Sequence, residues 1–129
     1  MGGIRVAPKI KAIYDKLGEE YGLAVDLAAF GFEMFGGFGE HSTTLKPKEK
    51  LAALIQNLET LPPGKWSFMD HPAYNTPEMR AIYHRGYEQV ALDRQGVTEA
   101  WTNEQVKEII KRRGIRLVSY GDVKKGLVD

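Results

Sequence analysis

The feature that most constrains the fold is a repeated order of segments, in which an amphipathic helix ends in a glycine turn and a short apolar run follows. Apolar residues at intervals of three and four predict helices, and short apolar runs between turn signals predict buried strands. The predicted helices are residues 8–21, 47–60, 77–93 and 102–113, and the predicted strands are residues 23–29, 65–71 and 115–120. This alternation favours an α/β fold whose parallel strands are joined by right-handed connections.

The first predicted helix shows the pattern most clearly. Pro8 suits the first helical position, and Gly22 follows the last periodic residue, where glycine often ends a helix. Its apolar stripe consists of Ile10, Ile13, Tyr14, Leu17 and Tyr21. A stripe of this width normally faces a hydrophobic core.

The number of strands limits the architecture. Three strands are few for a freestanding parallel sheet, whose faces and edges all need cover. We therefore expect a partial (βα) barrel-like fold that resembles part of a larger barrel or sheet. The 129 residues suffice for one domain with a core, and no composition shift marks a second, so residues 1–129 are predicted to form a single domain.

The composition excludes several classes of function. The chain has no cysteine, which rules out disulfides, zinc–thiolate sites and thiol nucleophiles. The net charge of +1, from 18 basic and 17 acidic residues, gives no reason to expect nucleic acid or an anionic membrane as a partner. No apolar run reaches the roughly 20 residues that cross a bilayer, and the N-terminus lacks the apolar core of a signal peptide. We therefore expect a cytoplasmic protein.

The candidate catalytic residue is His71. It lies in the segment Asp70-His71-Pro72, where the predicted strand 65–71 ends and a loop begins. The carboxyl ends of strands are where α/β folds carry their chemistry. The alternative is a histidine bonded to a neighbouring backbone group, with Pro72 shaping the turn. A direct pair of Asp70 and His71 is not expected, because adjacent strand residues point to opposite faces.

The other two histidines give a weaker signal. His84 is expected on the surface of the predicted helix 77–93, and His41 in a loop that enters a helix. The spacing of the three histidines matches no metal-ligand motif, so no metal ligand is assigned.

Two further features concern ligand contact. Tyr74 follows His71 closely and is the candidate substrate-binding residue, since sugars stack on aromatic faces. The segment 30–38 alternates phenylalanine with glycine and is expected to form a loop rather than a helix. It is either a hydrophobic lid or interface, or a loop that contacts ligand.

The ordered set of segments from His71 onward resembles the C-terminal part of the YdjC-like carbohydrate deacetylases, the chitooligosaccharide deacetylase family. The segments that carry the resemblance are His71-Pro72-Ala73, the region around Arg94, residues 102–111 and Arg113-Gly114-Ile115-Arg116-Leu117-Val118-Ser119-Tyr120 with Gly121-Asp122-Val123. The proline-started helix from Pro8 to Tyr21, with Gly22-Leu23 after it, also matches, so the resemblance covers nearly the whole chain.

The resemblance implies a distorted (βα) barrel and one divalent metal, magnesium or zinc, held by an aspartate and two histidines. The metal activates a water that cleaves the N-acetyl group of an amino sugar. On the match, His71 inherits the role of the acid that protonates the leaving amine.

The sequence departs from the family in one important respect. The N-terminal strand with its aspartate and the segment with the metal-ligand histidines have no counterpart, as if Met1-Gly2-Gly3 followed directly after them. The family's arginine after the segment matching 23–29 has no evident counterpart either. We therefore expect a C-terminal part of a deacetylase that holds no metal and is inactive alone. The alternative is a non-catalytic α/β domain that binds no metal and forms a homodimer through the phenylalanine loop 30–38, its open strand edge and its apolar face.

Overall fold

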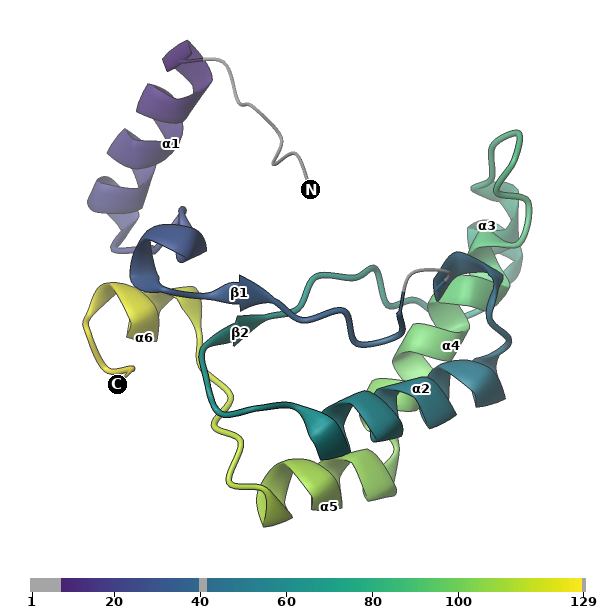
Figure 1. The fold of residues 1–129 in the computed structure, drawn as a ribbon. Coiled ribbons are helices and arrows are strands. Elements are labelled where there is room, and N and C mark those ends of the chain that lie inside the picture. Colours follow the sequence, from purple (N-terminus) through teal and green to yellow (C-terminus); the bar gives the residue numbers. More distant parts are fainter. Residues whose placement is uncertain (1–7, 40–41, 129) are drawn as a thin grey trace. The chain divides into compact units, whose positions relative to one another are not determined.

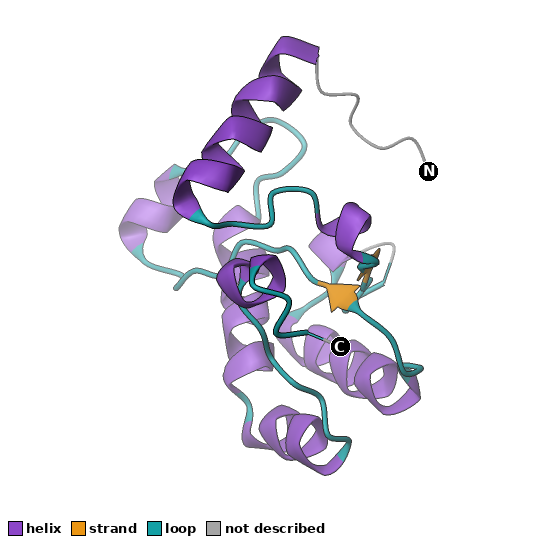
Figure 2. Ribbon diagram, turned by 90° about the vertical axis from the view of Figure 1, so that its left-hand side faces the viewer, coloured by secondary structure: helices purple, strands orange, loops and turns teal. Residues whose placement is uncertain are grey.

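A computed structural model describes residues 8–39 and 42–128 (Figure 1). The fold is mixed α/β and mostly helical, with a single small sheet in the described part of the chain (Figure 2). The chain divides into two compact units, one of Met1–Glu33 and Leu117–Asp129 and the other of Met34–Arg116. No described helix is long and apolar enough to cross a membrane.

The elements follow one another in a simple order. They are α1 (Pro8–Tyr21), a 3-10 helix η1 (Leu27–Phe30), β1 (Glu33–Met34), a 3-10 helix η2 (Ser42–Thr44), α2 (Pro47–Thr60), β2 (Trp66–Ser67), α3 (Pro77–Ala81), α4 (Val90–Thr102), α5 (Glu104–Arg112) and α6 (Tyr120–Lys124). The helices predicted over 8–21 and 47–60 are confirmed as α1 and α2, with the same bounds.

The predicted helix 102–113 is confirmed as α5, which begins two residues later, at Glu104, and ends at Arg112. Asn103 is the N-cap of α5, and its side-chain oxygen accepts a hydrogen bond of 2.9 Å from the backbone N–H of Gln105. Thr102 is instead the last residue of α4.

The predicted helix 77–93 is wrong. Thr76 caps α3 by accepting a hydrogen bond from the backbone N–H of Met79, but α3 ends at Ala81. A turn with a bridge between His84 and Tyr87 follows, and Gly86 within it has a φ of 87°. A left-handed residue of this kind interrupts a helix. Residues 94–101, which lie between the predicted helices 77–93 and 102–113, are helical and belong to α4.

The predicted three-stranded sheet is also wrong. The only part of it that forms a strand is Trp66–Ser67 of the predicted strand 65–71. This β2 pairs with β1, and the two run in the same direction (Figure 1). The backbone N–H of Phe35 continues the pairing with a hydrogen bond of 2.8 Å to the carbonyl oxygen of Ser67.

Local hydrogen bonds explain why the other two predicted strands do not form. In the predicted strand 23–29, the 3-10 helix η1 begins at Leu27. Its C-cap is Gly31, whose φ is 80°. In 115–120, the Ser119 hydroxyl accepts a hydrogen bond from the backbone N–H of Asp122, whose carboxylate accepts one from the Ser119 N–H. This reciprocal cap starts α6 at Tyr120, which is the last residue of the predicted strand 115–120.

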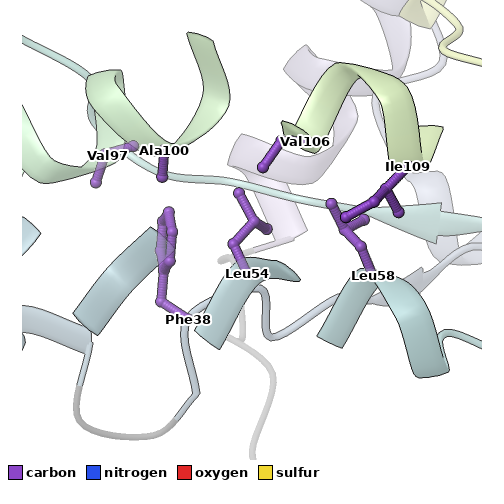
Figure 3. Packing of buried hydrophobic residues seen from close by; sticks show 7 residues of the cluster. All are labelled: Phe38, Leu54, Leu58, Val97, Ala100, Val106 and Ile109. Carbon is purple, nitrogen blue, oxygen red and sulfur yellow. The ribbon is translucent and has the colours of Figure 1, made fainter. Parts of the chain in front are cut away.

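The core of the unit Met34–Arg116 lies between three helices (Figure 3). Its buried members are Leu54 and Leu58 of α2, Val97 and Ala100 of α4, Val106 and Ile109 of α5, and Phe38. Phe38 comes from the predicted Phe/Gly loop and points toward α4 (Figure 3). The loop is therefore part of this core through Phe38, and Phe35 packs against the same cluster.

The other unit is held by a few specific contacts. Gly18 of α1 is buried, and a Cβ at this position would lie 3.0 Å from the carbonyl oxygen of Leu23. The backbone N–H of Ala24 donates a hydrogen bond of 3.2 Å to the carbonyl oxygen of Tyr120. Lys124 of α6 forms an ion pair with Glu19 of α1. These contacts join α1 to α6 without covering the apolar stripe of α1.

Candidate functional site

His71 lies on an exposed segment that follows β2. It is not within a strand, which corrects the predicted end of the strand 65–71. Oδ1 of Asp70 accepts a hydrogen bond of 2.7 Å from the backbone N–H of His71. This hydrogen bond involves the backbone and not the imidazole ring, so it does not orient the ring. His71 is exposed at the surface.

The segment that carries His71 is fixed to α4. The backbone N–H of Ala73 donates to the carbonyl oxygen of Arg94 at 3.3 Å, and the hydroxyl of Thr98 donates to the carbonyl oxygen of Ala73 at 2.9 Å. Two residues later, the backbone N–H of Asn75 donates to the side-chain oxygen of Gln95 at 2.8 Å. Since α4 contributes to the core, these bonds give an exposed loop a rigid support.

Tyr74 lies between these two anchored residues, and 68% of it is exposed. Its neighbour Asn75 is held further by Arg80 of α3, whose Nε donates to the Asn75 side-chain oxygen at 2.6 Å. The structure thus places His71 and Tyr74 on one short supported segment, with both side chains exposed.

The only other histidine among the described residues is His84. His84 is exposed in the turn between α3 and α4 rather than on a helix, and its ring lies 5.6 Å from that of Tyr87. The prediction for His41 lies outside the described residues. Among the residues that the structure describes, no three histidine, aspartate or glutamate side chains lie close enough together to hold a metal ion.

The strongest electrostatic feature is a buried ion pair between α2 and α4. Nζ of Lys50 lies 2.7 Å from Oδ1 of Asp93, and their side chains are only 1% and 5% exposed. Lys50 also donates a hydrogen bond of 2.5 Å to the carbonyl oxygen of Ser42 and lies 4.8 Å from the centre of the Phe38 ring. Oδ1 of Asp93 accepts no hydrogen bond of good geometry from described residues, so its contact with Lys50 is a close ion pair.

Tyr87 completes this network. Its hydroxyl donates a hydrogen bond to Oδ2 of Asp93. Burial and this hydrogen bond raise the pKa of Tyr87 from 10.0 to about 12. The network therefore links α2, α4 and the turn before α4 with its charges shielded from water, which is the arrangement of a structural element rather than of an accessible reaction site.

Lys50 and Asp93 were not predicted as a pair, although the sequence contains a signal for one. Lys50 is spaced by four residues from Leu54, and Leu54 by four from Leu58, so Lys50 lies on the buried face of α2. Asp93 stands in the same relation to Val97 on α4. Two opposite charges on the apolar faces of neighbouring helices indicate a buried pair.

Comparison with protein-family models gave no match, and comparison with curated proteins gave none either. The function therefore rests on the sequence pattern and on the geometry of the segment around His71.

Proposed function

We propose that this chain is the C-terminal part of a metal-dependent carbohydrate deacetylase, as its resemblance to the YdjC-like family implies. The observation that supports this proposal is the position of His71 and Tyr74. Both side chains are exposed on one segment, and hydrogen bonds from Ala73 and Asn75 hold that segment to α4. The partial barrel belongs to the same proposal, as does a cytoplasmic location.

The proposed roles follow from the chemistry of the two side chains. Hydrolysis of an N-acetyl group adds water to the carbonyl carbon and breaks the bond between carbon and nitrogen, and the leaving amine takes up a proton. An imidazole can supply that proton near neutral pH. The exposed phenol ring of Tyr74 would stack on the apolar face of the sugar and hold it beside His71.

The metal of the family does not fit the described residues. They contain no cluster of three histidine, aspartate or glutamate side chains that could bind it. We therefore assign no step of the reaction to a metal held by these residues, and we expect the chain alone not to release acetate. Magnesium or zinc would need ligands from outside the described residues.

Binding of an N-acetylated chitooligosaccharide, measured by titration calorimetry, tests the proposal. Tyr74→Ala should weaken binding about tenfold, since loss of an aromatic stacking contact costs about 1 kcal/mol or more. Tyr83→Ala is the matched control, because Tyr83 is 64% exposed against 68% for Tyr74 and lies in the turn after α3. The proposal is wrong if the wild-type chain does not bind at millimolar concentration or if both variants weaken binding equally.

A second candidate is a non-catalytic domain that self-associates. It is favoured by the apolar stripe of α1, whose five large side chains are all exposed. Exposed apolar surface of this extent commonly marks an interaction site.

A further inference from the structure

The helix α1 carries an apolar face that the other described elements of its own unit leave uncovered. Its stripe consists of Ile10, Ile13, Tyr14, Leu17 and Tyr21, which are between 41% and 68% exposed. The only buried residue of the helix is Gly18, which lies against the chain that follows α1. The stripe has the spacing of a helix that packs against another apolar surface.

The charges of α1 are distributed unequally between its ends. Lys9 and Lys11 lie in the first turn, and Glu19 and Glu20 lie in the last. No acidic residue stands in the first turn and no basic residue in the last, so the charges oppose the helix dipole, which favours acidic residues at the N-terminus and basic ones at the C-terminus. An antiparallel neighbour with the same sequence would place its acidic end beside the basic end of this helix.

We propose that α1 binds α1 of a second copy of the chain in an antiparallel arrangement. This inference rests on the second candidate function and specifies its interface. A parallel pair would bring equal charges together at both ends, whereas the antiparallel pair brings opposite charges together at both ends. The stripe would then be buried against its own copy.

The size of the stripe predicts a weak dimer. Large side chains present about 150–250 Å² each, and about half of each member is exposed, which gives about 500 Å² per chain. The total of about 1,000 Å² is close to the lower limit for a specific interface. We expect a dimer that dissociates on dilution through the micromolar range.

Sedimentation velocity over a dilution series tests the position of the interface. Ile13→Glu should raise the dissociation constant of the dimer about tenfold or more, because it places a charge within the stripe. Ile82→Glu should leave the constant unchanged, and it is a matched control because Ile82 is 57% exposed against 58% for Ile13. A dimer that resists Ile13→Glu would overturn the α1 interface while leaving self-association intact.

Charge exchange tests the antiparallel arrangement without altering the stripe. Lys9→Glu and Glu20→Lys should each weaken the dimer, and the double variant should restore it. The two single variants should also form a mixed dimer in preference to either homodimer. A double variant no tighter than the single ones would exclude antiparallel pairing.

A monomer at every concentration would overturn both the α1 pairing and the second candidate function. If Ile13→Glu also lowers the melting temperature of that monomer, the stripe is covered from within the chain. Neither result bears on sugar binding at Tyr74, so the deacetylase proposal is tested separately.

Discussion

Replacing Lys50 by methionine tests the buried ion pair, because it removes the charge and keeps an unbranched apolar stem in nearly the same space. Nζ of Lys50 lies 2.7 Å from Oδ1 of Asp93 and 2.5 Å from the carbonyl oxygen of Ser42, and the side chain is 1% exposed. The substitution leaves the Asp93 carboxylate buried without its cation. Loss of one partner of a buried pair costs about 3–5 kcal/mol. Because Tyr87 still donates to Asp93, we expect about 3 kcal/mol, which corresponds to a fall of about 10 °C in the melting temperature.

Calorimetric melting or denaturant unfolding measures this loss. Lys11→Met is the matched control, since Lys11 pairs with Asp15 on the exposed surface of α1 at 2.7 Å, and it should change the melting temperature far less. The double variant Lys50→Met with Asp93→Asn should recover most of the stability, because it removes both buried charges. The reasoning is refuted if Lys50→Met has the melting temperature of the wild type, or if the double variant is as unstable as the single one.

Three further substitutions test other contacts of the same unit. The pKa of Tyr87 is about 12 in the native state against 10.0 ordinarily, so between these pH values the native state keeps a proton that the unfolded chain loses. The free energy of unfolding should therefore fall as the pH rises from 10 to 12. Unfolding curves of Tyr87→Phe should lack this part of the pH dependence. Gly96→Ala should lower the melting temperature, because its Cβ would lie 2.9 Å from Cδ of Lys50, whereas Gly121→Ala in α6 should not, because its nearest neighbour is 3.7 Å away. Phe38→Ala should cost about 3–5 kcal/mol of unfolding free energy, since Phe38 is buried between three helices.

The helices were predictable where the spacing of apolar residues and the residues that typically start and end helices agree. α1 and α2 each begin at a proline and carry a regular apolar stripe, and both form with the expected bounds. The region 77–93 contains the same spacing, but α3 ends at Ala81, because Ile82 leaves the helical conformation with a ψ of 85°, and Gly86 in the following turn has a left-handed φ of 87°. A single internal glycine does not show from the sequence whether it is tolerated in a helix or breaks it.

The strands were much less predictable. A short apolar run fits a buried strand, a 3-10 helix or an extended segment against a core, and periodicity alone does not separate them. Residues 23–29 and 115–120 are examples, since local hydrogen bonds in η1 and in the Ser119 cap decide the outcome. The cap was visible in the sequence as Ser119 with Asp122 three residues later.

The choice of His71 and Tyr74 as site residues stays a prediction, and their structural setting was not predictable from the sequence. His71 ends the predicted strand 65–71 and Tyr74 follows it, whereas in the structure both lie on an exposed segment whose support comes from α4. That support depends on one backbone hydrogen bond and on two hydrogen bonds with the side chains of Gln95 and Thr98, which lie 20 and 25 residues from their partners in sequence, so no local pattern encodes it. Their roles in sugar binding and proton transfer remain predictions.

The proposed function requires that His71 contacts a bound amino sugar. Nuclear magnetic resonance of the histidine rings tests this contact most directly. The chain has three histidines, whose signals can be assigned with His71→Ala and His84→Ala. On titration with an N-acetylated chitooligosaccharide and with its deacetylated form, we expect the ring signals of His71 to move to saturation and those of His84 to stay in place. Signals of His71 that do not move at millimolar sugar, or that move no more than those of His84, would contradict the proposed site.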